Sequence, residues 1–254
     1  MEKLYKAWRD YDIEFFYVYT REPHPGFYEK QQTKDLKERK ANAKQCQKEL
    51  GMTLPWIIDD MKSSIQRAYG GLPNSAYIIG SNGKVFYKEA WADASNLDKK
   101  LKEMYKSDPK LKTNAVKYLE GNILSEKKAE RRAELMVKLS RIDCEDARKV
   151  LGRILKKEKE TDVKTELIKS LTNTSQKQYI EFLIETLEDT EEDVRSVTLK
   201  TLKELTGKTF DFDAAAEEAE RSKSIVKWKS WWGENKDRLV WSEELERFEA
   251  KKEK

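Results

Sequence analysis

The sequence of 254 residues predicts a two-part protein, with an α/β part over residues 1–108 and an all-α part over residues 109–254. Three observations predict this division. Apolar, β-branched runs alternate with helical patterns in the first part, strand signals largely stop after Asp108-Pro109, and two similar helical stretches recur further along. Alternating strands and helices are typical of an α/β layer, and recurring helix pairs are typical of a helical repeat.

In the first part, two short apolar runs predict strands. Ile13–Thr20 is β-branched and aromatic with little polar alternation, so it predicts a strand buried on both faces, and Leu54–Asp60 predicts a second one. Asn82-Gly83, between two further β runs, predicts a hairpin. Periodicity and flanking glycines predict these helices: Glu2–Asp10, Thr33–Leu50, Met61–Gly71 and Asn96–Tyr105. We therefore expect a mixed sheet covered by helices.

The expected helix Thr33–Leu50 carries one of the two cysteines. Its apolar side comprises four residues: Leu36, Ala43, Cys46 and Leu50. A helix N-terminus favours a thiolate, and Cys46 lies near the opposite end, so a core thiol is expected and a redox role is the alternative. Cys144 follows Asp143, which we expect to cap a helix of the second part with Asp146 as its partner.

The second part contains an internal repeat. The stretch "DVKTELIKSL" begins at Asp162 and "DVRSVTLKTL" begins at Asp193, an offset of 31 residues. Between them "KQYIEFLIETLED" has the pattern of the second helix of a pair. Two helices in roughly 30 to 40 residues predict a HEAT-like α-solenoid. An ordinary helical bundle with chance similarity is the alternative.

The C-terminal region, about residues 208–254, is rich in tryptophan. Four of the seven tryptophans fall within fourteen residues. Trp228, Trp231 and Trp232 lie on adjacent faces at helical spacing. They predict a cap that closes the last repeat, because an open solenoid must cover its core. The alternative is a protein-binding patch, since tryptophan is enriched at binding hot spots.

Composition excludes several classes of function. The 51 basic and 47 acidic residues are mixed along the chain rather than gathered in a basic stripe, so no nucleic-acid partner is expected. Two cysteines and one histidine provide no metal pattern or disulfide framework, and we expect neither metal nor cofactor. The residues as written contain no membrane helix or secretion signal, which predicts a cytoplasmic protein.

Several motifs of the first part occur in a familiar order. "FFYVYTREPHPG", "LPWIIDDM" and "RAYGGLPNSAYIIGSNGKVFYK" resemble the iodothyronine deiodinase family and its bacterial redoxin relatives, over residues 3–105. The resemblance implies a thioredoxin-like fold. It matches a Glu-x-His-Pro loop to Glu22–Pro25, and implies a pocket lined by these residues: Glu22, His24, Leu72 and Pro73. Pro73 would take the place of that fold's cis-proline. "LTGKTFDFD" and "WKSWWGENKDRLVW" look like bacterial HEAT-repeat proteins.

The sequence departs from the deiodinase pattern at the nucleophile. In that family the catalytic selenocysteine or cysteine precedes the first helix expected here, whereas no cysteine precedes Cys46. One prediction is a module without catalysis that binds protein or acts as a scaffold through its HEAT-like repeats. The other is an N-terminally truncated thiol oxidoreductase, similar to a reductive dehalogenase, for which His24 and Cys46 are the weak catalytic candidates.

A partner is expected on physical grounds. A thioredoxin-like sheet without its first strand exposes an unpaired edge, which readily associates with other chains. We expect the N-terminal helix, the helical part or a second copy to cover this edge. This predicts a substantial interface between the two parts or a homodimer, in addition to a protein partner.

Overall fold

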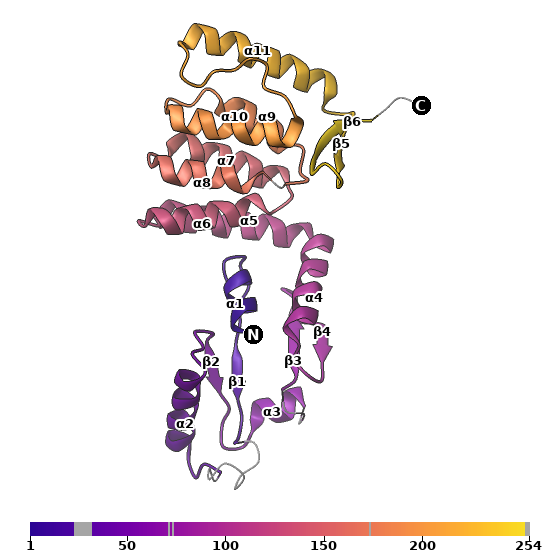
Figure 1. The fold of residues 1–254 in the computed structure, drawn as a ribbon. Coiled ribbons are helices and arrows are strands. Elements are labelled where there is room, and N and C mark those ends of the chain that lie inside the picture. The colour runs from indigo at the N-terminus through magenta and orange to yellow at the C-terminus, as the bar shows by residue number, and fades with distance from the viewer. Residues whose placement is uncertain (23–31, 71, 73, 173, 252–254) are drawn as a thin grey trace. The chain divides into compact units, whose positions relative to one another are not determined.

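The computed structural model describes residues 1–22, 32–70, 72, 74–172 and 174–251 (Figure 1). Over these residues the protein is a mostly helical α/β protein with eleven helices and three two-stranded sheets. It forms two compact units, a first unit over Met1–Leu111 and a second unit over Lys112–Lys254.

The first unit alternates helices and strands, as its sequence predicts. Its helices are α1 Glu2–Trp8, α2 Leu36–Glu49, α3 Ser64–Tyr69 and α4 Ala94–Ser107. Its strands are β1 Tyr17–Tyr19, β2 Trp56–Ile58, β3 Ala76–Ile79 and β4 Val85–Glu89. β1 pairs with β2 in parallel, with Val18 opposite Ile57. β3 and β4 form the predicted antiparallel hairpin, with a bulge between Ile78 and Ile79, and Gly83 has the positive φ of 73° that its turn requires.

The expected single mixed sheet is therefore two separate strand pairs among the described residues. The strands are also shorter than predicted, and the prediction that they are buried on both faces is wrong. Phe16, Tyr17 and Ile57 are exposed. The reason is that each strand has a single neighbour, so much of its apolar surface has nothing to pack against.

Helix α2 begins three residues later than the predicted Thr33 and ends one residue before the predicted Leu50. The Asp35 side chain accepts a hydrogen bond from the amide of Glu38 at 2.8 Å, and the Glu38 carboxylate accepts one from the amide of Lys34 at 2.7 Å. These reciprocal bonds satisfy amides that the first turn leaves free. The predicted apolar side is only partly buried. Ala43 is buried, whereas Leu36 and Leu50 are exposed and Arg39 is buried in their place.

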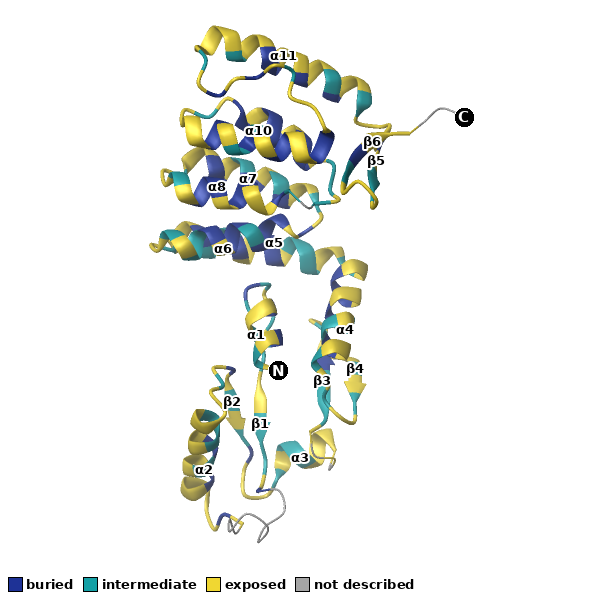
Figure 2. Cartoon of the chain, viewed as in Figure 1, coloured by how far each residue is buried: buried dark blue, intermediate teal, exposed yellow. Residues whose placement is uncertain are grey.

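The second unit consists of helices that pack in two layers. They are α5 Pro109–Ser125, α6 Ala129–Ser140, α7 Glu145–Lys157, α8 Thr161–Ser170, α9 Tyr179–Thr186, α10 Glu192–Thr206 and α11 Glu218–Asn235. α8 contacts α6 and α10, while α9 contacts α7 and α11. Figure 2 shows both buried and exposed residues on the helices of this unit that it labels. This amphipathic stacking buries one continuous core.

The chain ends in a feature that the sequence analysis missed, a β-hairpin of β5 Leu239–Ser242 and β6 Arg247–Ala250. Its pairing is antiparallel, with Trp241 opposite Phe248, and β6 contacts α10. The cap expected over residues 208–254 thus contains both a helix and a small sheet. Within the described ranges, no helix has the length and apolar character needed to cross a membrane.

Candidate functional site

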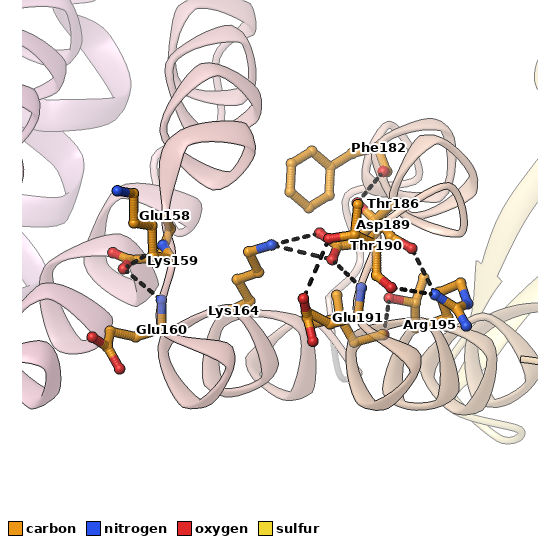
Figure 3. A network of polar contacts seen from close by, with 12 residues as sticks. Glu158, Lys159, Glu160, Lys164, Phe182, Thr186, Asp189, Thr190, Glu191 and Arg195 are labelled. Carbon is orange, nitrogen blue, oxygen red and sulfur yellow. Dashed lines mark hydrogen bonds and ion pairs between the residues drawn. The ribbon is translucent and has the colours of Figure 1, made fainter. Parts of the chain in front are cut away.

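The helix pairs of the second unit repeat a cation at one helix position, which is buried at Lys164 and Arg195 and half-buried at Arg132. Arg132, Lys164 and Arg195 each stand at the fourth residue of their helix, in α6, α8 and α10. The Arg132 guanidinium donates to both carboxylate oxygens of Glu158 at 2.9 and 3.0 Å. The Lys164 ammonium donates to both carboxylate oxygens of Asp189 at 3.1 and 2.8 Å (Figure 3). The predicted 31-residue recurrence therefore extends to the contacts that join neighbouring helix pairs.

The acidic partners recur at the same interval. Glu158 accepts from the amide of Glu160 at 3.1 Å, and Asp189 accepts from the amide of Glu191 at 3.0 Å, so each carboxylate also fixes the turn before the next helix. Burial would raise the pKa of Glu158, but hydrogen bonds from Arg132 and from main-chain amides outweigh burial and hold the pKa below its usual value. A carboxylate with a depressed pKa stays charged at neutral pH.

Arg195 ends this series with a different partner. It donates to the carbonyl oxygen of Ala214 at 2.9 and 2.6 Å, and to those of Asp189 and Thr190 at 2.9 and 2.8 Å. A buried guanidinium with several acceptors is well satisfied. The side chain thus ties the segment after α10 back onto the turn before it.

Beside these contacts lies a hollow of about 420 Å³ between α7, α9 and α11. Its lining is Gly152, Leu155, Lys156, Phe182, Glu185, Thr186, Glu188, Asp189 and Lys229. Two ion pairs stand at its rim. Lys156 lies 4.0 Å from Glu185, and Lys229 lies 2.7 Å from Glu188. The lining thus combines two apolar side chains, Leu155 and Phe182, with side chains of both charges.

The sequence analysis predicted none of the residues that line this hollow, and Gly152 is the one among them with a signal in the sequence. It lies inside α7, where glycine costs about 1 kcal/mol relative to alanine. A Cβ placed there would meet no atom within 4 Å, so packing does not require the glycine. The signal was available, because a glycine inside an amphipathic helix is unusual, but only the stacked helices place it beside Phe182 and Lys229.

In the first unit, the predicted pocket residue Glu22 is buried after β1. It accepts hydrogen bonds from the Tyr19 hydroxyl at 2.9 Å and the Asn42 amide group at 3.1 Å, with longer contacts from Thr33. Burial would raise the pKa of Glu22, yet the bonds from Asn42 and Tyr19 hold it below its usual value. Of the other predicted pocket residues, Leu72 is 61% exposed, and His24 and Pro73 lie outside the described residues.

Two further charged residues of the first unit are buried and were not predicted. Asp59 follows β2 and accepts from the amides of Ile65 and Gln66 at 2.9 and 3.0 Å. Arg39 donates to the carbonyl oxygens of Asp59 and Asp60 at 3.2 and 2.5 Å. Because these bonds go to main-chain groups, their role is to hold the turn between β2 and α3.

The two thiols are free and half-buried. Cys46 lies in the last turn of α2, close enough to Tyr17 and Tyr19 to contribute to the raised pKa of both phenols, which burial dominates. Cys144 is itself the N-cap of α7, without a side-chain hydrogen bond. The prediction that Asp143 caps this helix is wrong, since its carboxylate lies instead 3.4 Å from the Arg148 guanidinium.

The tryptophans of α11 face the core. Trp228 and Trp232 are buried, and Trp231 is half-buried. The Phe210 ring lies 4.8 Å from that of Trp228, at a steep interplanar angle of 81°. A binding role for Trp228 or Trp232 would require the side chain to leave the core, whereas their burial suits the predicted cap.

The described residues contain no cluster of three or more potential metal ligands. Comparisons with known proteins found no matching family model, no matching curated protein and no matching solved structure. The function is therefore inferred from the residues and their geometry.

Proposed function

We propose that this chain is a protein-binding scaffold, in which a HEAT-like α-solenoid follows a non-catalytic thioredoxin-like module of the iodothyronine deiodinase type. The observation that carries this proposal is the recurrence of the ion pairs between helix pairs. Arg132 with Glu158 and Lys164 with Asp189 repeat at intervals of 32 and 31 residues along successive helices. Stacked repeats of this kind present extended surfaces for protein partners.

We place the contact with the partner at the hollow between α7, α9 and α11. Burying one aliphatic or aromatic side chain there contributes about 1.5–3 kcal/mol, which alone gives only weak affinity. The partner must therefore extend beyond the hollow, along the charged residues of its rim, where Lys156 pairs with Glu185 and Lys229 pairs with Glu188. Mixed charge at the rim favours a partner with both acidic and basic flanks.

The test uses the full chain as bait for a random peptide library, followed by calorimetry on the recovered peptides. Gly152→Leu fills the hollow and should weaken binding at least about tenfold, the loss expected for an excluded anchor side chain. Gly121→Leu is the matched control, since Gly121 also lies inside a helix, α5, and also has open space around its Cβ. Equal affinity of the two variants would refute the site.

A thiol oxidoreductase is the second candidate. The observation in its favour is that Cys46 lies near Tyr19, whose hydroxyl binds the predicted pocket residue Glu22. Against it, Cys46 lies in the last turn of α2, while a reactive thiolate is stabilised at the opposite end of a helix. Dithiol-dependent turnover that disappears in Cys46→Ser would replace the scaffold proposal with this one.

A further inference from the structure

The β3–β4 hairpin of the first unit has one covered face and one open face. On the covered face, Ile78 is buried and stands opposite Tyr87. The ammonium group of Lys100 in α4 lies 5.6 Å from the centre of the Tyr87 ring. The amide of Asp93, the N-cap of α4, donates to Glu89 at 2.8 Å. Helix α4 therefore packs on this side of the hairpin.

On the open face Tyr77 packs against Tyr69 of α3, with the ring centres 5.1 Å apart, and the apolar side chains beyond it are about half exposed. Ile79 and Val85 stand opposite each other and are 47% and 54% exposed, and the neighbouring Phe86 is 46% exposed. Figure 2 shows β4 as mainly exposed. Tyr77 stands opposite Lys88, whose ammonium group lies 5.5 Å from the centre of the Tyr77 ring. A small apolar patch thus adjoins a cation on the same face.

The outer edge of β4 is also unpaired. Among the described strands β3 is its only neighbour, so one row of its backbone N–H and C=O groups faces outward. β4 contains no proline, which is a common protection of edge strands. An unpaired edge beside an exposed apolar face is the geometry that accepts an added strand.

Charge indicates what kind of strand would fit. The first unit has 20 basic and 16 acidic residues and so carries the whole net charge of +4. Lys84, directly before β4, and Lys88, near the end of β4, are both exposed. If β4 of a second copy paired with this edge, the lysines of both copies would lie close together in one short strand pair, where like charges are unfavourable.

We propose that the free edge of β4 binds an extended segment of a partner protein that carries apolar and acidic side chains, as a third strand of the hairpin. Main-chain hydrogen bonds supply affinity that does not depend on sequence. An apolar side chain beside Val85 and an acidic one beside Lys88 supply selectivity. This site lies in the first unit and is independent of the hollow between α7, α9 and α11.

The test uses the full chain and two end-blocked peptides, Thr-Val-Thr-Glu-Thr-Val-Thr and the same peptide with Lys in place of Glu. The acidic peptide should bind about tenfold more tightly, with amide protection of Val85–Glu89 in hydrogen exchange. Lys88→Glu should reverse the preference. Lys62→Glu, the same charge change at an exposed position outside the strands, should leave it unchanged.

N-methylated versions of the acidic peptide separate strand addition from adsorption on the apolar face. A strand added at an edge donates alternate N–H groups, so methylation of one alternate set should abolish binding while methylation of the other set is tolerated. The proposal is wrong if both sets behave alike, if the lysine variants do not differ, or if neither peptide binds at millimolar concentration. Self-association of the chain without peptide would also contradict it, by assigning the edge to a second copy.

Discussion

The two units differ in how completely they bury their own apolar side chains. Of the 18 large hydrophobic side chains that are exposed among the described residues, 13 lie in the first unit. Of the 43 hydrophobic residues in the buried core, only nine lie there. The second unit thus closes its core by itself, whereas the first unit leaves apolar strands uncovered.

The difference follows from the number of neighbours that each element has. α8 and α9 each contact helices on two sides, and α11 covers the end of the stack with the buried Trp228. In the first unit each strand has one partner, and a two-stranded sheet is marginal without further covering. Stacked helices cover one another's apolar faces, whereas the apolar faces of a two-stranded sheet must be covered by another element or a partner.

The largest expected contrast is between one tryptophan of each unit. Trp228 is 0% exposed and Trp91 is 69% exposed. Trp228→Ala should lower the free energy of unfolding of the second unit by about 3–5 kcal/mol, because it leaves a cavity. Trp91→Ala should change that of the first unit by less than about 0.5 kcal/mol. Denaturant titrations monitored by hydrogen exchange measure the stability of each unit separately. Equal losses of unfolding free energy in the two variants would contradict this contrast.

A similar loss is expected for the buried ion pair that joins α8 to the turn before α10. Lys164→Ala leaves Asp189 as a buried charge without its cation, which costs about 3–5 kcal/mol. The control is Lys149→Ala in α7, whose pair with Glu145 is exposed to solvent and so should change stability far less. The same denaturant titrations measure both variants. A small effect of Lys164→Ala would mean that water reaches Asp189.

Acid should weaken both units, but through different partners. The pKa values of Glu22 and Glu158 lie below the ordinary value of 4.5, so each stabilises the folded state above that pH and loses this contribution as pH falls through the lower folded-state pKa. Glu158 pairs with a guanidinium, while the donors to Glu22 are neutral. Added salt should therefore reduce the contribution of Glu158 to the pH dependence of stability, but not the contribution of Glu22. Each contribution is measured as the pH dependence that is lost in Glu158→Gln or in Glu22→Gln.

Hydrogen exchange between about pH 3 and 6, the range in which such carboxylates titrate, checks this for each unit. The expectation is wrong if salt affects the two carboxylates equally, or if either Gln variant keeps the full acid sensitivity.

The smallest expected effects come from two glycines of the second unit and have opposite signs. Gly152→Ala should stabilise the unit by up to about 1 kcal/mol, because a helical Cβ has open space there. Gly207→Ala should destabilise it by about 1 kcal/mol, because φ is +69° and the Cβ would lie 3.3 Å from the Arg247 guanidinium. Thermal melts measure both. A stability change of the same sign in both variants would show that backbone conformation does not determine the effect of the added methyl group.

Local chemistry was readable from the sequence. Gly51 marks the end of α2, Asn82-Gly83 marks the hairpin, and the 31-residue offset places α8 and α10 in register. These signals depend on residues close together in the chain, so no knowledge of neighbours is needed to interpret them. The recurrence even aligns Lys164 with Arg195, although the pattern did not reveal what those cations bind.

Burial and the candidate sites were decided by tertiary structure alone. The apolar run that predicted a doubly buried strand leaves Phe16 exposed, and the expected apolar side of α2 exposes Leu50 but buries Arg39. Hydrophobicity indicates that a side chain favours burial, whereas the neighbours that bury it come from distant parts of the chain. Gly152 and Lys229 likewise share one hollow only because three helices stack there.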